Sequence, residues 1–324
     1  MKASIAAAGR PRIAIQSGLQ QFMAFGSLIL LIIVFSLASS SFFHFSNIVG
    51  ILLSTAVTGV LALGSTFVIV TGGIDLSVGT VMTLSSVMTG VFITMWGWPI
   101  EVGIVGGLLT GALCGFISGT AVARLGIPPF IATLAMMMIA KGLSLVISGT
   151  KPVYFTNTPA FSKISLGSVL DIPNAVFIYF GAAIVGGILL SRTIVGRYNF
   201  AIGSNEEATR LSGVNVRFWK IVIYTITGLF TGLAGILMAS RLNSAQPALG
   251  MGYELEAIAA VVIGGTSLSG GKGTIVGTVI GALIMSVLTN GLRILSVPQE
   301  WQTVVVGLVI LLAVYVDILR RKKA

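Results

Sequence analysis

The chain offers few side chains that could do covalent or metal chemistry. It has one histidine, His44, one cysteine, Cys114, and nine Asp and Glu side chains among 324 residues. An enzyme needs a nucleophile, a base or several metal ligands close together, and a disulfide needs two cysteines. The composition therefore argues against an enzyme, a metal centre and an internal disulfide, and no cofactor is expected.

A phosphate-binding loop around Lys272 fails at two fixed positions. The motif G-x-x-x-x-G-K-[ST] requires glycine at position 266 and Ser or Thr directly after the lysine. The sequence has Thr266 and Gly273 there. We therefore expect no nucleotide hydrolysis by this chain.

The longest charged interval, residues 192–220, predicts a short helix outside the membrane. It holds seven charged side chains, in a chain with only 19 Lys and Arg and 9 Asp and Glu. Ser204 is the expected N-cap, Glu207 would complete a capping box, and Gly213 is the expected residue after the helix.

The side chains of this predicted helix are suited to docking. Glu206 and Arg210 are four residues apart, in the favourable order for an ion pair. Ala208 and Leu211 form a narrow apolar ridge. A helix of about two turns is marginal alone in water, so the segment either docks on a partner or is an ordinary solvated loop.

The bulk composition, 55% hydrophobic and 9% charged, predicts an all-α polytopic membrane protein embedded in the lipid bilayer. The net charge of +10 does not indicate nucleic acid as a partner, because Lys and Arg are not clustered with aromatic residues. Each span needs roughly 20 apolar residues. The ten expected spans are 22–38, 48–70, 77–95, 102–123, 130–149, 174–191, 221–239, 257–265, 274–292 and 301–316.

Two of these spans leave alternatives open. The first resembles a signal peptide but is longer than the usual apolar core, so we expect a retained helix; cleavage would leave one span fewer. Segment 257–265 must either extend into its flanks or be a half-helix. The expected organisation is an N-terminal cytoplasmic segment 1–21, one transmembrane domain 22–316 and a basic cytoplasmic tail 317–324.

Basic residues predict that both termini and the charged interval face the cytoplasm. With the N-terminus inside, fourteen Lys and Arg fall inside and four outside, which is a strong positive-inside bias. The inside residues are Lys2, Arg10, Arg12, Arg124, Arg192, Arg197, Arg210, Arg217, Lys220, Lys272, Arg320, Arg321, Lys322 and Lys323, and the outside residues are Lys151, Lys163, Arg241 and Arg293.

Glycines recur every four residues in two of the predicted spans. They are Gly103, Gly107, Gly111, Gly115 and Gly119 in one span, and Gly273, Gly277 and Gly281 in the other. Such stripes let helix backbones approach closely. Because four exceeds 3.6, each stripe drifts around its helix, so we expect right-handed crossings or contact with two partners, with packing as the main role.

Four residues are candidates for a translocation path. Asp75, between two spans, either caps the following helix or faces the path, and Lys141, within a span, either faces the path or snorkels. Gly264 and Gly265 open the segment GGTSLSGG, which partly repeats GGIDLSVG at residues 72–79. Both segments interrupt apolar runs and are expected on the same side of the membrane, where they could border a conduit.

Charge inside the membrane separates the remaining function classes. Ion-coupled transporters carry carboxylates or proton relays at mid-membrane, and none is expected there in this chain. A passive conduit for an uncharged or polyhydroxy solute remains, driven by energy supplied from elsewhere. The outward loops 150–173 and 241–256, with Asn157, Gln246 and Glu254, are the expected contacts for a soluble partner, unless residues 245–256 form a re-entrant gate.

Five motifs in order resemble a known family. They are GGIDLSVG, G-x-N-E-x-A-x-R-L-x-G-V at residues 203–214, SAQP from Ser244, GYELEAIAAVVIGGTSLSGGKG from Gly252, and NGL from Asn290. This set is similar to the permease subunit of bacterial ABC importers for ribose and related monosaccharides, over about residues 45 to 318.

The resemblance implies ten helices, a second permease copy or a related permease, a cytoplasmic ATP-binding subunit and an extracytoplasmic sugar-binding protein, in the bacterial inner membrane. It also implies that segment 203–213 is a coupling helix that docks on the ATP-binding subunit. The residues assigned to this coupling role are Gly203, Asn205, Glu206, Ala208, Arg210, Leu211 and Gly213. The solute stays open among ribose, xylose, arabinose, galactose, a furanose and autoinducer-2, and a stand-alone transporter or channel is the alternative.

This coupling role predicts the outcome of two substitutions. Leu211→Asp should abolish docking and sugar uptake, whereas Asn199→Ala, just outside the predicted helix, should have much less effect.

Overall fold

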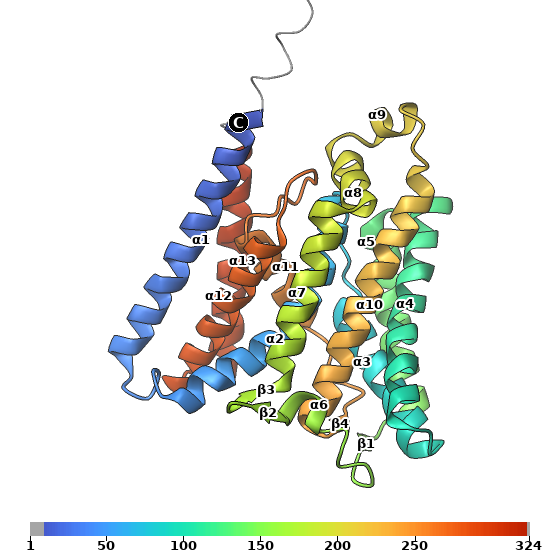
Figure 1. Ribbon diagram of the computed structural model, residues 1–324, viewed down its shortest axis with the longest axis vertical. Coiled ribbons are helices and arrows are strands. Elements are labelled where there is room, and N and C mark those ends of the chain that lie inside the picture. The colour runs from blue at the N-terminus through green and yellow to red at the C-terminus, as the bar shows by residue number, and fades with distance from the viewer. Residues whose placement is uncertain (1–9, 323–324) are drawn as a thin grey trace, which may run out of the picture.

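The protein, described here by a computed structural model over residues 10–322, with side chains over 22–319, is a bundle of helices with very little sheet (Figure 1). The long helices are α1 Arg10–Ala38, α2 Phe45–Val70, α3 Val78–Gly90, α4 Ile100–Arg124, α5 Pro129–Ser148, α7 Asn174–Arg192, α10 Val216–Leu242, α12 Ile275–Ile294 and α13 Gln299–Lys322. The short elements are the π-helical turn Val91–Met95 that continues α3, α6 Lys163–Leu166, α8 Ile194–Ser204, α9 Glu206–Leu211, α11 Tyr253–Ile263, β1 Val153–Tyr154, β2 Ser168–Val169, β3 Ile172–Pro173 and β4 Ser244–Ala245.

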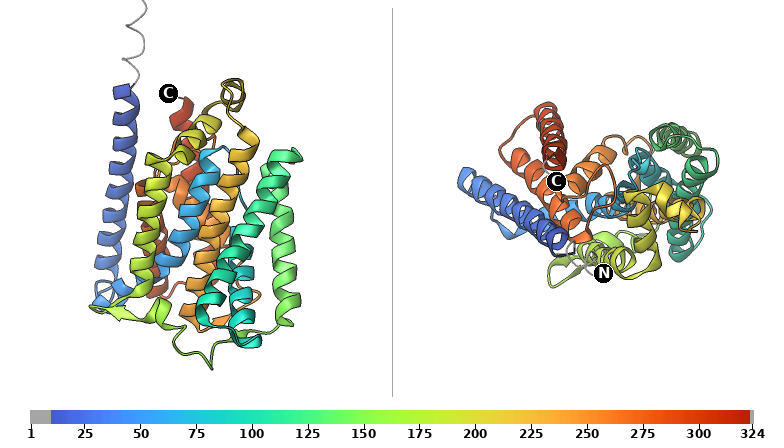
Figure 2. Two further views of the ribbon diagram at one scale, coloured as in Figure 1. Left: turned by 45° about the vertical axis from the view of Figure 1, so that its right-hand side comes forward. Right: turned by 90° about the horizontal axis from the view of Figure 1, so that it is seen from above.

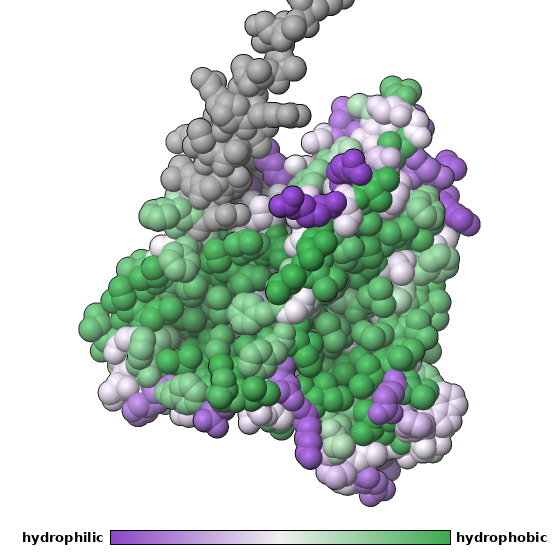
Figure 3. Space-filling model, in the orientation of Figure 1, coloured by the Kyte–Doolittle hydropathy of each residue, from purple (hydrophilic) through white to green (hydrophobic). Residues whose placement is uncertain are grey.

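Eight helices of the described region are long and apolar enough to cross a membrane. They coincide with eight of the ten predicted spans, and Figure 3 shows the hydrophobic belt that they form between two hydrophilic ends. Of the other two, α1 has an apolar stretch Phe22–Ala38, and α11 is only 11 residues long. At 1.5 Å per residue α11 spans about 16 Å, so it is the half-helix that the sequence left as one option.

The predicted terminal segments are not separate elements where the structure describes them. Residues 1–9 and 323–324 lie outside the described range. Helix α1 begins at Arg10, within the predicted N-terminal segment, and α13 continues through the predicted tail as far as Lys322.

Two segments that cross the helix bundle are only partly helical. Each consists of a non-helical stretch followed by a helix that begins in the interior of the bundle. Residues 73–77 lead into α3, and residues 246–252 lead into α11. The two helices begin side by side, because a Cβ atom on Gly79 would fall on the carbonyl oxygen of Gly250, and the reverse also holds. From this point α3 runs toward β1, where Gly90 lies against Val153, and α11 runs toward the opposite end. Irregular backbone is tolerated at this depth only where protein or a watery cavity surrounds it.

The glycine stripe of α4 contacts two neighbouring helices, as its drift predicts. Gly103 and Gly107 lie against Thr89 of α3, whereas Gly111 and Gly115 lie directly on the backbone of α10 at Gly228 and Tyr224. No side chain separates the α4 and α10 backbones at these positions, so van der Waals contact between the two helices is close and extended.

The glycines of α12 form the same kind of contact with the half-helix α11. A Cβ atom on Gly277 would meet the carbonyl oxygen of Gly264, and one on Gly281 would meet that of Ala260. These contacts hold α11 in the bundle. A helix of 11 residues is only marginally stable by itself, so it depends on such packing.

Opposite ends of the bundle carry different polar elements (Figure 2). Helices α8 and α9 cover one end. The other end carries two antiparallel pairs of very short strands, β1 with β4 and β2 with β3. The elements that could meet soluble partners are therefore separated by the full height of the bundle.

Candidate coupling segment and transport path

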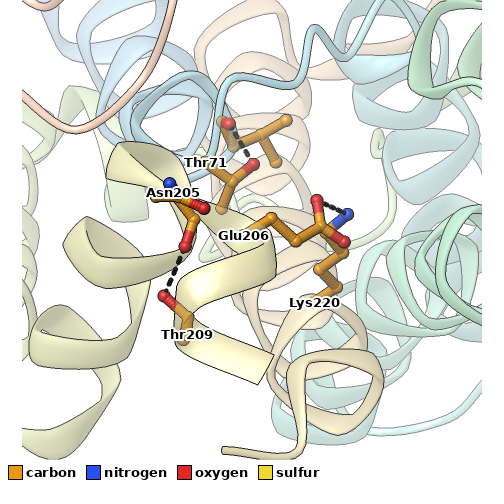
Figure 4. Close-up of polar contacts among 6 residues, drawn as sticks. Thr71, Asn205, Glu206, Thr209 and Lys220 are labelled. Carbon is orange, nitrogen blue, oxygen red and sulfur yellow. Dashed lines mark hydrogen bonds and ion pairs between the residues drawn. The ribbon is translucent and has the colours of Figure 1, made fainter. Parts of the chain in front are cut away.

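The predicted short helix exists as α9, but Ser204 does not begin it. Ser204 is the last residue of α8, and Asn205 is the N-cap of α9. The Asn205 backbone is extended, and its Oδ1 accepts a hydrogen bond from the Ala208 amide at 2.9 Å. Asn205 also binds the helix through its carbonyl oxygen, to which the Thr209 hydroxyl donates at 2.8 Å (Figure 4). The capping box predicted from Ser204 and Glu207 is therefore wrong, because α8 continues one residue further than local signals indicate.

The end of α9 is as predicted at Gly213. Its φ of +84° is a left-handed conformation that favours glycine. The Gly213 amide donates to Arg210 O at 3.0 Å, and the Val214 amide donates to Thr209 O at 3.4 Å. These two bonds form a Schellman motif, which ends the helix sharply.

The ion pairs of α9 differ from the predicted pair between Glu206 and Arg210. Arg210 pairs with Glu207 at 2.6 Å, and Glu206 pairs with Lys220 at 2.7 Å, as Figure 4 shows for the second pair. The Lys220 side chain comes from the first turns of α10, so this pair ties α9 to a membrane helix. Since Glu206 is half exposed, the pair is worth well under about 1 kcal/mol.

One face of α9 is exposed and contains the predicted apolar ridge. Leu211 is 78% exposed and Ala208 is also exposed, whereas Thr209 is buried against the rest of the protein. At this exposure the Leu211 side chain buries little apolar surface within this chain. The exposed ridge is available to a partner.

Helix α8 places this segment directly on the ends of two crossings. A Cβ atom on Gly203 would fall on the carbonyl oxygen of Val70, the last residue of α2, and close to the amide of Gly271. The Gly271 amide itself donates to Val70 O at 2.9 Å. The two glycine segments, 72–79 and 264–271, therefore meet under α8, on the same side as predicted.

Asn199 also holds α8 in place. The side chain is fully buried, and its Nδ2 donates to Phe67 O at 3.1 Å. The structure changes the expectation for Asn199→Ala: we now expect this substitution to destabilise the contact between α8 and α2, because it removes a buried hydrogen-bond donor to an α2 carbonyl.

The segment that contains Asp75 is held by side-chain hydrogen bonds. Asp75 is buried, and its Oδ1 accepts from the Ser77 amide at 2.8 Å and from the Ser77 hydroxyl at 2.6 Å. This is a turn directly before α3, whose N-cap is Ser77, and not a cap of the helix itself. The Thr133 hydroxyl of α5 accepts from the Leu76 amide at 3.1 Å.

The other three predicted path residues do not join Asp75. Lys141 is half-buried in α5, eight residues and about 12 Å beyond Thr133. Gly264 packs against Gly277 of α12, and Gly265, with φ +90°, turns the chain after α11. The structure therefore gives both glycines a packing or turning role.

Two carboxylates lie deeper than predicted, because α11 begins at Tyr253. Glu254 is buried in its first turn, where it accepts from the Gly252 amide at 3.1 Å and lies against Gly79. Glu256 is half-buried on another side of α11. Two carboxylates that the sequence placed in an outward loop therefore lie within the helix bundle, and Glu254 does not face a soluble partner in this conformation.

The two outward loops named from sequence lie side by side. Val153 pairs with Ala245 and Tyr154 with Ser244, and the Phe155 amide donates to Asn243 O at 3.2 Å. Asn157 is exposed, whereas Gln246 is half-buried and donates to the Ser244 hydroxyl at 2.9 Å. The strand pairing joins the loops into one surface.

These features define a class of protein: a polytopic helical membrane protein with interrupted crossings and a short exposed helix, α9. Its described residues contain no group of His, Cys, Asp and Glu that could hold a metal. A family of transport proteins, described as the permease component of branched-chain amino acid transport systems, matches residues 47–314. The chain belongs to this family, and it is a multi-pass inner-membrane protein.

Several relatives match almost the whole chain. The ribose import permease protein of Escherichia coli strain K12 is 44% identical over 296 residues, covering 90% of this chain and 91% of that protein. The ribose import permease protein of Bacillus subtilis strain 168 is 43% identical over 314 residues, covering 97% of each chain. The fructose import permease protein of Rhizobium meliloti is 40% identical over 305 residues, covering 92% of this chain and 85% of that protein. No solved structure matches this chain significantly.

Membership has two consequences for the chain's role. It is a permease component of an ATP-driven importer and not the subunit that hydrolyses ATP. Such an importer includes an ATP-binding subunit and a substrate-binding protein as partners. The family description mentions amino acids, whereas these relatives are named as sugar import permeases and match nearly the full chain.

Proposed function

We propose that this chain forms the membrane path for a ribose-like monosaccharide, which a binding protein delivers from outside. The observation that carries this proposal is the 43–44% identity to ribose import permease proteins over at least nine tenths of the chain. The fructose relative, at 40%, leaves other monosaccharides open.

The exposed ridge of α9 supports a docking role on the ATP-binding subunit. In this proposal Ala208 and Leu211 contact the ATP-binding subunit, and Asn205, Glu206, Arg210 and Gly213 keep the helix in shape. Gly203 transmits movement of α8 to the end of α2 and to the 264–274 loop, because its backbone contacts Val70 O and the Gly271 amide directly, with no side chain between them. The exposed position of Leu211 supports this role over an ordinary solvated loop.

The surface formed by loops 150–173 and 241–256 is the proposed contact for the sugar-binding protein. Asn157 is exposed on this surface, and Gln246 lies beside it on the paired loop. The fourteen-to-four basic count supports an orientation with α9 and both termini in the cytoplasm and this surface outside. A second permease, identical or related, completes the path in this proposal.

Reconstitution tests the proposal directly. Proteoliposomes containing this chain, its ATP-binding subunit and its binding protein should take up radiolabelled D-ribose only when ATP is present. Each subunit is omitted in turn, and D-fructose, D-xylose, D-allose and autoinducer-2 are compared at equal concentration. ATP-independent uptake by this chain alone would instead support a stand-alone transporter or channel.

Thiol labelling tests the proposed orientation. In a Cys114→Ser background, a cysteine at Asn157 should react with an impermeant maleimide in intact cells, whereas one at Asn205 should react only after permeabilisation. Labelling of both positions from outside would contradict the orientation.

A further inference from the structure

A cavity of about 490 Å³ lies between α2, α10, α11, α12 and α13. Its volume is within the usual range of small-molecule sites, which is about 300–1,000 Å³. Met251, Gly252 and Leu255 line it and are exposed, so the cavity is open and not sealed. It lies in the half of the bundle that holds the last turns of α10 and α12.

The charged side chains of this cavity, together with one tyrosine and one glutamine, come from four helices. Arg241 is in the last turn of α10 and Arg293 in the last turn of α12. Tyr253 and Glu256 are in the first turn of α11, and Gln302, which is buried, is in α13. Charged side chains inside a membrane bundle are costly and are usually retained for function.

Glu256 and Arg293, two charged groups of the cavity, attract each other without forming a direct ion pair. Within the part of the chain whose side chains are described, no ion pair joins Arg241 or Arg293 to a carboxylate. Glu256 interacts with the Thr58 hydroxyl of α2, which also lines the cavity. Hydrogen-bond donors on two guanidinium groups and acceptors on one carboxylate therefore face the same space.

This combination fits a neutral polyhydroxy ligand better than an anion or a cation. Each sugar hydroxyl both donates and accepts, so it can bind a carboxylate and a guanidinium together. For a phosphate or a lipid headgroup phosphate, Glu256 offsets part of the attraction of the two arginines, so the net attraction is that of about one positive charge. The ring of Tyr253 offers an apolar face for the C–H groups of a sugar.

We propose that this cavity is a sugar-binding position that this subunit contributes to the transport path, in which Glu256, Arg241 and Arg293 bind hydroxyl groups of the monosaccharide during transport. The inference rests on the proposed function, since it assigns a place to the same solute. The sequence placed Arg241, Glu256 and Arg293 in outward-facing segments, whereas this proposal places them along the transport path.

The test uses the complete importer in proteoliposomes, with D-ribose and 2-deoxy-D-ribose as probes. Glu256→Gln and Arg241→Gln are compared with wild type. Glu101→Gln and Arg124→Gln are matched controls, because they make the same chemical changes at exposed ends of α4. Loss of one charge-assisted hydrogen bond should lower D-ribose uptake about tenfold or more, with the controls unchanged.

The ratio of the two sugars separates binding from a structural role. The same binding protein is present in every sample, so a changed ratio belongs to the permease. We expect Glu256→Gln or Arg241→Gln to change the ribose to deoxyribose ratio at least about threefold, because a hydroxyl loses its partner. Co-purification of the ATP-binding subunit should stay normal, since α9 lies at the other end.

Each alternative outcome has a distinct meaning. If the wild-type importer moves no sugar, the proposed function itself fails. If wild type transports and both variants transport equally well, the cavity is not a sugar position. Reduced uptake with an unchanged sugar ratio would overturn the inference in favour of a structural role. Loss of bound phospholipid from the purified variants, with an unchanged ratio, would overturn it in favour of a lipid site.

Discussion

Two regions stand out in the sequence, the glycine stripe of α4 and the charged interval 192–220 that forms α8 and α9. They differ in where their packing partners lie. The α4 glycines find their partners within the chain, as Gly111 on Gly228 shows, and leave no space for a side chain. Helix α9 leaves Leu211 78% exposed and is attached mainly at its ends. The difference teaches that the glycine pattern of α4 is satisfied inside the subunit, whereas the apolar ridge of α9 stays exposed, as the proposed docking on a second subunit requires.

The largest expected effect follows from filling the α4–α10 contact. Gly111→Leu places a side chain on Gly228 O and on the Gly232 backbone, which cannot move aside as a flexible side chain would. We expect a cost of about 3 kcal/mol or more and loss of folded permease from the membrane. Membrane level and monodispersity in detergent measure the effect.

Gly187→Leu is the matched control for this substitution. It makes the same change in α7, where no atom lies within 4 Å of the added Cβ. If the Gly111→Leu permease accumulated in the membrane as well as Gly187→Leu, close packing of α4 on α10 would not be required for folding, and the contrast with α9 would fail.

The next effect concerns Leu211→Asp, which should leave folding intact but remove docking. Burial of a leucine in the partner is worth about 1.5–3 kcal/mol, and a buried carboxylate adds a desolvation cost. We expect normal membrane levels with loss of ATP-binding subunit in pull-downs and loss of uptake. Leu125→Asp is the control, since Leu125 is 71% exposed at the end of α4 on the same side. Normal uptake by Leu211→Asp would make α9 an ordinary loop.

An intermediate effect is expected at Gly203, where the two regions meet. Gly203→Ala puts a methyl group on Val70 O and must push α8 away from α2. The exposed ridge of α9 is unchanged, so we expect subunit association within about twofold but uptake about tenfold lower, equivalent to about 1.4 kcal/mol. Uptake and association are measured in parallel, with Gly181→Ala in open space as control. Parallel loss of both would assign Gly203 to docking and not to transmission.

The smallest effect should come from Gly213→Ala at the end of α9. A φ of +84° costs an alanine about 1–2 kcal/mol, which acts on local fraying of the helix. We expect faster hydrogen exchange at the amides of Gly213 and Val214 and a drop in uptake of less than about threefold. Gly142→Ala, an ordinary helical glycine in open space, should leave exchange in α9 unchanged. Unchanged exchange at Gly213 would show that the Schellman turn does not hold α9.

Features that depend on neighbouring residues were determined by the sequence itself. Apolar runs of membrane length predicted the spans, a period of four predicted the glycine contacts of α4, and Gly213 ended α9 where expected. These signals succeed because hydrophobic length, helical period and left-handed turns are local properties.

Only the tertiary structure decided which side chains meet across long separations. Asn205 replaces Ser204 as N-cap because α8 is held to the distant end of α2 through Gly203 and Asn199. Glu254 and Glu256 enter the bundle because α11 begins beside Gly79, about 170 residues away in the chain. Arg241 and Arg293 line one cavity because α10 and α12 end at the same level around α11. Such contacts depend on how whole helices pack, and a local pattern of residue types does not contain that information.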